Sequence, residues 1–206
     1  MRFFDRRLVM TMALTVLLAA CGGSAGGAVS GDDMSLGKAD AKVTVVEYAS
    51  ASCSHCASWN NEVFPAFKAK YIDTGRVRYV FREFLTPPVE LASASFLMAR
   101  CAGKDKYFPV IEAVFHNQAE MYQSGDMRGG LLRIAQSVGM SEKEFTQCIS
   151  DDEALKALND RVEKYQREAD ITATPTFVVN GKKLESGAAT LVQLDAAIAE
   201  AEAAAK

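Results

Sequence analysis

The sequence predicts an α/β protein in which a strand–helix–strand unit and a later hairpin–helix unit are separated by a block of helices. The first unit lies within 40–86, and the hairpin and the final helix lie within 171–206. Between them, over 87–170, apolar residues recur at helical spacing without strand-like alternation. The chain has 206 residues and is 49% hydrophobic, which favours one domain with an insertion and a substantial core.

The first unit opens with a strand that leads into a helix. The run "AKVTVVEYAS" at 41–50 is rich in β-branched residues, which favour a buried strand. The segment 56–75 then places bulky residues from Trp59 to Tyr71 at intervals of four, so that they share one helical face. Pro65 predicts a kink inside this helix.

A second strand and a run of helices follow. The alternating segment "RVRYVFREF" at 76–84 predicts a strand parallel to the first, because the helix between them leaves room for a right-handed crossover. Ser141 and Glu144 predict a capping box at the start of one later helix. The helical patterns of the block lie at 89–102, 105–118, 128–139, 141–150 and 152–170.

Strand character returns at the C-terminal end. In "TPTFVVNGKKLESG" at 174–187, Asn180 and Gly181 lie between two short strand patterns, and this dipeptide is typical of a two-residue hairpin turn. The last segment predicts a helix with Thr190 as its N-cap. Without the helical block, this order of elements has the outline of a thioredoxin fold.

The motif "CSHC" carries the clearest chemical signal. Cys53 and Cys56 fit half of a zinc site, a structural disulfide or a redox dithiol. Zinc is disfavoured because a structural site needs four ligands, and besides this pair the chain offers His55, His116 and two cysteines that lack tight spacing. Cys53 lies at a predicted strand–helix junction, where unpaired N–H groups and the helix dipole stabilise a thiolate. We therefore expect Cys53 to be the nucleophile, Cys56 the resolving thiol and His55 an added charge or donor.

Two further segments are candidates for the same site. Glu47 lies in an otherwise apolar strand, where a carboxyl group is costly unless it is paired or functional. It predicts a proton relay to Cys56 or, alternatively, a carboxylate at the polar edge of the strand. Pro175 directly precedes a strand, and a cis Thr174–Pro175 bond would present backbone groups to an extended substrate. A trans proline that only opens the strand is the alternative.

These features together resemble the DsbA family of thiol–disulfide oxidoreductases. The resemblance rests on "CSHC" behind an acid-bearing strand, on the helical insertion and on "TPTFVVNG", and it covers about 40–206. It implies the thiol roles given above, thiolate stabilisation by His55, and a substrate groove that includes Ser54, Thr174 and a cis Pro175. It implies no cofactor and no metal. The best-known members have proline at the position of Ser54.

The same resemblance assigns Cys101 and Cys148, both on predicted helices of the block, to a structural disulfide. The residues alone also allow two separately buried thiols or a second redox relay. A disulfide here closes a loop of about 48 residues and would stabilise the fold by about 4 kcal/mol through chain entropy.

The N-terminal segment predicts export. Several arginines within the first seven residues precede an uncharged stretch, which is typical of a signal peptide and short for a membrane anchor. "LAAC", ending at Cys21, resembles the bacterial lipobox, in which the cysteine is lipidated and becomes the new N-terminus. We therefore expect a lipoprotein signal peptide at 1–20 and a flexible Gly/Ser-rich tether at 21–39. An ordinary signal peptide without lipid is the alternative.

The formal net charge of −3, with no basic cluster beyond the first seven residues, argues against nucleic-acid binding. The DsbA resemblance implies a protein that introduces disulfides into exported proteins, and the lipobox resemblance implies an extracytoplasmic lipid anchor. We expect a monomer. A DsbB-type membrane partner would reoxidise it. One alternative is a reductase or isomerase supplied with electrons from a membrane donor. Another is a lipid-anchored peptide-binding or chaperone module without catalysis.

Overall fold

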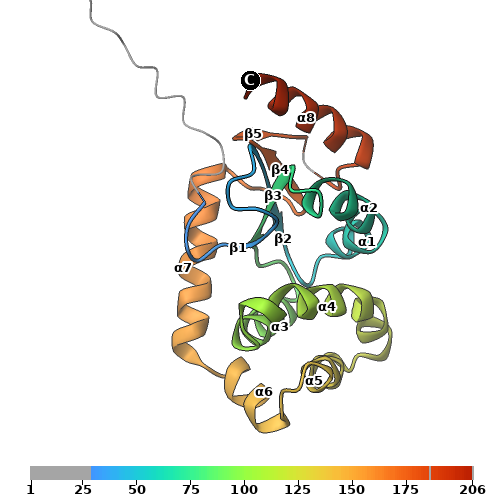
Figure 1. Cartoon of the computed structure of the whole chain (residues 1–206). Coiled ribbons are helices and arrows are strands. Elements are labelled where there is room, and N and C mark those ends of the chain that lie inside the picture. Colours follow the sequence, from blue (N-terminus) through green and yellow to red (C-terminus); the bar gives the residue numbers. More distant parts are fainter. Residues whose placement is uncertain (1–28, 186, 206) are drawn as a thin grey trace, which may run out of the picture.

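The computed structural model describes residues 29–185 and 187–205 (Figure 1). The predicted signal peptide at 1–20 and the predicted lipidation site, Cys21, lie outside the described residues. The strands are β1 (Met34–Leu36), β2 (Val43–Ala49), β3 (Val77–Glu83), β4 (Thr176–Val179) and β5 (Lys182–Lys183). The helices are α1 (Ser54–Glu62), α2 (Phe64–Phe67), the π-helical turn η1 (Lys68–Ile72), α3 (Val89–Cys101), α4 (Lys104–Ser124), α5 (Met127–Ser137), α6 (Glu142–Ile149), α7 (Asp152–Ala169) and α8 (Leu191–Ala204).

The strands of the described chain form one sheet in the order β1-β3-β2-β4-β5. β2 and β3 run parallel, with Glu47 opposite Phe81, and the other neighbouring strands are antiparallel. Asn180 and Gly181 join β4 to β5 with positive φ angles of 44° and 84°, as the hairpin prediction requires. Because α3–α7 lie between β3 and β4 in the chain, the predicted thioredoxin fold with a helical insertion is confirmed.

Each face of the sheet has its own core, because successive residues of a strand point to opposite faces. Val45 and Phe81 contribute to a large core that includes residues of α1, α2, α8 and the inserted helices α3–α6. Val46 and Val80 contribute to a smaller core on the other face, which residues of α7 complete. Figure 1 shows α7 lying along that face, away from α1 and α2.

The helix after β2 is broken, as Pro65 predicts. α1 ends at Glu62, and α2 restarts the helix with Pro65 in its first turn before η1 completes it. Trp59 of α1 is 1% exposed in the large core. Its ring centroid lies 4.7 Å from that of Phe177, and its Nε1–H donates to the carbonyl oxygen of Ala189 at 2.8 Å. This side chain therefore fixes α1 against β4 and the start of α8.

The predicted flexible tether at 21–39 is wrong for its last part, because Met34–Leu36 form the edge strand β1. Asp33, just before this strand, is buried, and its carboxylate accepts hydrogen bonds from Arg82 at 3.1 Å and from Tyr165 at 2.8 Å. A three-residue strand is too short to show alternation in the sequence. Arg82, the ion-pair partner of Asp33, lies 49 positions further along the chain, so no local pattern indicates the strand.

One buried carboxylate at the end of β3 bonds to three of the inserted helices. Glu83, at the end of β3, is 0% exposed. It accepts hydrogen bonds from Arg100 of α3 at 2.6 Å and from Arg161 of α7 at 3.0 Å. Tyr107 of α4 donates to the same carboxylate at 3.1 Å. Three helices of the block therefore converge on one strand end.

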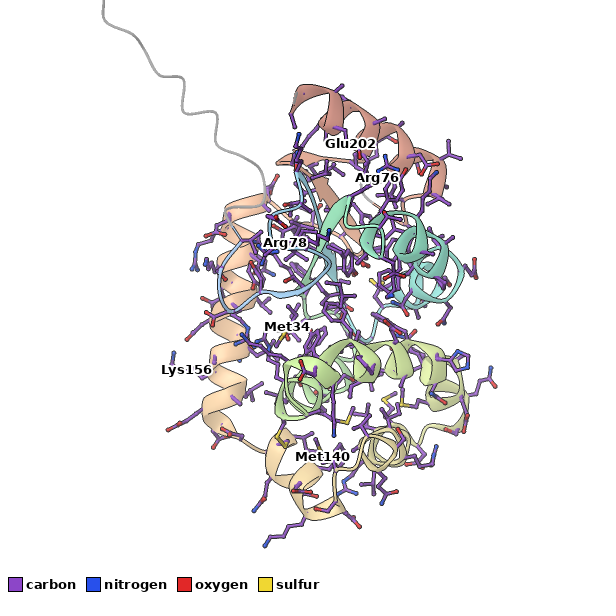
Figure 2. All side chains as sticks on the ribbon, viewed as in Figure 1. Met34, Arg76, Arg78, Met140, Lys156 and Glu202 are labelled. Carbon is purple, nitrogen blue, oxygen red and sulfur yellow. A yellow bond between two sulfur atoms is a disulfide. The ribbon has the colours of Figure 1, made fainter. Side chains whose placement is uncertain are left out.

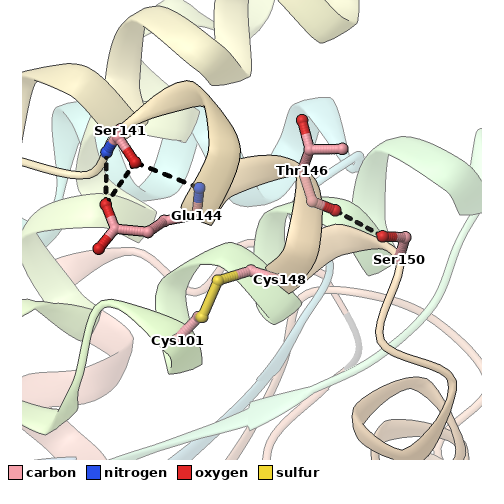
Figure 3. The surroundings of a disulfide bond; sticks show 6 residues. All are labelled: Cys101, Ser141, Glu144, Thr146, Cys148 and Ser150. Atoms are coloured by element: carbon pink, nitrogen blue, oxygen red, sulfur yellow. Dashed lines mark hydrogen bonds between the residues drawn. A yellow bond between two sulfur atoms is a disulfide. The ribbon is translucent and has the colours of Figure 1, made fainter.

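A disulfide joins α3 to α6 within the block (Figure 3). Its cysteines are Cys101 and Cys148, the pair that the resemblance implied, and their Cα atoms lie 6.0 Å apart. Beside it, Ser141 and Glu144 form the predicted capping box at the start of α6. The cap and the disulfide together fix α6 at both ends.

The C-terminal helix is held by a cap and an ion pair. Thr190 caps α8, as the sequence predicts. Arg76, directly before β3, donates to Glu202 of α8 through two hydrogen bonds of 2.9 and 2.8 Å, and Figure 2 shows the two residues side by side. Among the described residues, no helix is both long and apolar enough to span a bilayer.

Candidate active site

The two cysteines of "CSHC" lie where the loop after β2 enters α1. Cys53 is the N-cap of α1 and is partly exposed, whereas Cys56, one turn into the helix, is buried. Both are free thiols. Ser54 and His55 occupy the exposed side of the first turn. The junction therefore presents one accessible sulfur with a second, buried sulfur directly behind it.

The pKa of Cys53 is lowered from 9.0 to about 5. The largest cause is a hydrogen bond from the Cys56 side chain, which outweighs the effect of burial. A hydrogen bond from the Thr174 side chain and the backbone N–H groups of Cys56 and His55 also lower it. His55 thus contributes through its backbone N–H, one of the unpaired donors in the first turn of α1.

The pKa values of the two buried groups near Cys53, Cys56 and Glu47, are raised instead of lowered. Burial raises the pKa of Cys56 well above its usual value, and the charges of Glu47 and Cys53 act in the same sense. Glu47 is 1% exposed, and burial raises its pKa from 4.5 to about 8 although Tyr79 donates a hydrogen bond to its carboxyl group. The alternative of a carboxylate at the polar edge of β2 is therefore wrong.

A loop from the far end of the chain lies beside the exposed sulfur. The Thr174–Pro175 bond is cis, as the resemblance implies. The Cys53 thiol donates to the carbonyl oxygen of Thr174 at 3.3 Å across 121 positions of sequence. Thr174 is partly exposed and Pro175 is buried, so backbone groups of the loop are presented next to the sulfur. The sequence does not indicate a second cis bond, Pro87–Pro88.

Side chains that the sequence did not single out hold the loop at 50–53. The Ser52 hydroxyl donates to the carbonyl oxygen of Thr86 at 2.7 Å, just beyond β3. From α4, Gln118 and Tyr122 donate to carbonyl oxygens of this loop at 2.8 and 2.5 Å. A glutamine on the apolar face of a predicted helix is a weak signal for Gln118, and Tyr122 gives none.

The other predicted site residues lie apart from the dithiol. Cys101 and Cys148 form their disulfide between α3 and α6. Within the described ranges, no group of three or more His, Cys, Asp or Glu side chains could hold a metal ion.

The fold and the site together define the class. An accessible thiol at a helix N-terminus, a buried thiol one turn later, a cis-proline loop beside them and an inserted helical block are the features of a DsbA-type protein with the thioredoxin fold. The chain belongs to the thioredoxin family, because the family model described as Thioredoxin matches residues 29–200.

Curated relatives agree with this class. A putative protein-disulfide oxidoreductase of Rickettsia bellii is 35% identical over 156 residues, which cover 75% of this chain and 60% of that protein. Disulfide bond formation protein D of Bacillus subtilis is 28% identical over 153 residues, covering 73% of this chain and 69% of that protein. The chain thus spans about 60% of the length of the Rickettsia bellii relative.

Solved structures give the same result for the fold. The alpha-DsbA1 protein of Wolbachia pipientis matches with a TM-score of 0.78 and 28% identity, over 86% of this chain and 94% of that one. Oxidised BdbD of Bacillus subtilis matches with a TM-score of 0.70 and 26% identity, over 82% of this chain and 92% of that one.

Proposed function

We propose that the chain is a thiol–disulfide oxidoreductase that introduces disulfides into exported proteins through Cys53 and Cys56. The observation that carries this proposal is the placement of a partly exposed Cys53 at the N-terminus of α1 with the buried Cys56 one turn later. In this arrangement the pKa of Cys53 is lowered to about 5 and that of Cys56 is raised. A stable Cys53 thiolate favours the reduced pair, so the corresponding disulfide readily accepts electrons. The similarity to a putative protein-disulfide oxidoreductase of Rickettsia bellii and to disulfide bond formation protein D of Bacillus subtilis supports the same activity.

The reaction starts from a disulfide between Cys53 and Cys56. A substrate thiolate attacks the Sγ atom of Cys53, which forms a mixed disulfide, breaks the Cys53–Cys56 bond and releases Cys56 as a thiolate. A second substrate thiolate then attacks the substrate sulfur of the mixed disulfide, and Cys53 leaves as a thiolate. Two electrons pass from the substrate to the pair, and the substrate gains a disulfide. The low pKa of Cys53 makes it a good leaving group in the second step.

Glu47 is suited to protonate Cys56 when Cys56 is released. A thiolate at the buried Cys56 position is disfavoured, as its raised pKa indicates. With a pKa of about 8, the Glu47 carboxyl group is mostly protonated at neutral pH and can give up its proton when a nearby thiolate forms. The Tyr79 hydroxyl, which donates to Glu47, orients this group. We therefore assign the proton relay to Glu47.

The substrate is expected to bind across the exposed face of the site. Thr174 and the cis Pro175 present backbone groups beside Cys53, where an extended peptide can pair with them. Ser54 is exposed next to the sulfur and lies at the edge of this surface. Substrates are therefore proteins with cysteine thiols in unfolded or extended segments.

The cellular setting is part of the proposal. We infer that the chain is exported, lipidated at Cys21 and held at the extracytoplasmic side of a bacterial membrane, where it acts as a monomer. A DsbB-type membrane partner would take two electrons from the Cys53–Cys56 pair and so restore the disulfide. Disulfide formation requires such an oxidising compartment.

The test is the equilibrium reduction potential of the Cys53–Cys56 pair in glutathione buffers, measured on the Cys21→Ala protein. We expect a value above about −200 mV, which is the range of proteins that oxidise others. A value near that of thioredoxin, about −270 mV, would overturn the oxidase direction in favour of a reductase. The Cys53→Ala variant should lose all turnover. If disulfide formation persisted in that variant, the assignment of the nucleophile would be wrong, and peptide binding without turnover in the wild type would indicate a chaperone module.

A further inference from the structure

The loop that presents Cys53 is held by side chains of a single inserted helix. From α4, Gln118 donates its Nε2–H to the carbonyl oxygens of Ala51 at 2.8 Å and of Cys53 at 3.4 Å. Tyr122, about one turn later, donates its hydroxyl to the carbonyl oxygen of Ser52 at 2.5 Å. Three successive carbonyl groups of the loop therefore point at donors from α4.

The burial of Gln118 and the position of Tyr122 near Cys53 indicate that these hydrogen bonds matter for the site. Gln118 is 3% exposed, and a buried amide is retained where its hydrogen bonds are satisfied. Tyr122 is partly exposed, and its pKa is raised by burial and by the charge of Cys53. The Tyr122 hydroxyl thus lies within the electrostatic field of the reactive sulfur.

The opposite side of the loop is fixed to the sheet. The Ser52 hydroxyl donates to the carbonyl oxygen of Thr86 at 2.7 Å, and the backbone N–H of Thr86 donates to the Ser50 hydroxyl at 3.2 Å. The loop is therefore clamped between the segment that follows β3 and helix α4. Of these contacts, the hydrogen bonds from Gln118 and Tyr122 are the ones that the inserted helices supply.

We propose that Gln118 and Tyr122 are positioning residues through which the helical insertion sets the geometry of the reactive Cys53. The inference deepens the proposed function and rests on it. The backbone N–H groups of His55 and Cys56 stabilise a thiolate only while the sulfur stays within their reach. A loop released from α4 can move the sulfur out of that reach, which leaves the thiolate less stabilised.

The test uses two variants and one matched control. Tyr122→Phe removes only a hydroxyl, and Gln118→Met removes the amide donor while keeping the length of the side chain. In each, we expect the pKa of Cys53 to rise by about 1 unit, a tenfold change in its acid dissociation constant. The same tenfold change lowers the reduction potential of the pair by about 30 mV.

Tyr107→Phe is the control, because it removes a hydroxyl from the same helix that bonds to Glu83 and not to the loop. It should leave the pKa of Cys53 and the reduction potential unchanged while lowering the free energy of unfolding. If Tyr122→Phe behaves like Tyr107→Phe in all three measurements, the positioning role is wrong. Tyr122 is partly exposed, so its variant carries the test even if Gln118→Met fails to fold.

The pKa titration also separates this inference from the proposed function. An unchanged Cys53 pKa in the Tyr122 and Gln118 variants, with normal disulfide formation by the wild type, overturns the positioning role alone. A wild type that forms no disulfides, with a raised Cys53 pKa in the Tyr122→Phe variant, overturns the proposed function and supports the positioning role.

Discussion

Replacing Cys56 with alanine is expected to raise the pKa of Cys53, because a hydrogen bond from the Cys56 side chain is the largest cause of its low value. A hydrogen bond to a charged group contributes about 1.5–3 kcal/mol. A thiol is a weak donor and Cys53 is partly exposed, so we take ~1.4 kcal/mol, which corresponds to about 1 pKa unit. From the wild-type value of about 5, the pKa of Cys53 in the Cys56→Ala variant should therefore rise to about 6.

The assay follows the ultraviolet absorbance of the Cys53 thiolate as the pH is raised, with the alkylation rate as an independent check. Cys56→Ser is the matched control, because its hydroxyl can still donate to the thiolate. The serine variant should remain closer to the wild-type pKa than the alanine variant does. If Cys53 keeps the wild-type pKa in both variants, the Cys56 side chain does not stabilise the thiolate.

Three other changes test stability by urea unfolding, with Cys53 and Cys56 reduced and the Cys101–Cys148 disulfide intact. Glu47 has a folded pKa of about 8 against 4.5, so the wild type loses stability as the pH rises from 4.5 through 8. The free energy of unfolding of Glu47→Gln, relative to that of the wild type, should therefore increase by roughly 3 kcal/mol as the pH rises from 4 to 7. Replacing Cys101 and Cys148 together with alanine should cost up to about 4 kcal/mol through the greater freedom of the unfolded chain. Asp33→Ala removes the carboxylate from the 1% exposed Arg82 and should cost about 3–5 kcal/mol.

Each of these has an outcome that contradicts it. A Glu47→Gln gain that is the same at pH 4 and pH 7 would show that the carboxyl group is not buried with a raised pKa. Unchanged unfolding of the double cysteine variant would mean that the disulfide is not formed in the wild type. Arg82→Met with Asp33→Ala should recover much of the single-variant loss, and no recovery would argue against the buried ion pair.

The order of elements could be predicted because it depends on local signals. The capping box at Ser141, the cap at Thr190 and the turn at Asn180 and Gly181 are each complete within a few residues. β1 could not be predicted, because three residues show no periodicity and their stability comes from pairing with distant β3. Local patterns therefore indicate the elements, whereas edge strands depend on partners that the sequence does not reveal.

The candidate site divides in the same way. Cys53 and Cys56 were predicted because their spacing places one thiol at a helix terminus and the other one turn inside. Stabilisation of the Cys53 thiolate by N–H groups of the first turn was also predicted. That the Cys56 side chain is the largest cause of the low pKa could not be predicted, since it depends on how the two sulfur atoms are oriented in the folded helix. Gln118 and Tyr122 act across a long sequence separation, which only the folded structure brings close.

Trp59 gives this protein an optical signal of its own. It is the only tryptophan in the chain, and it lies in α1 less than one turn after Cys56. Its indole is 1% exposed and donates a hydrogen bond to the carbonyl oxygen of Ala189. Its fluorescence emission therefore reports on the position of α1 relative to its neighbours and not on contact with solvent. A change in fluorescence on oxidation of the dithiol would therefore follow the redox state in real time without an added label.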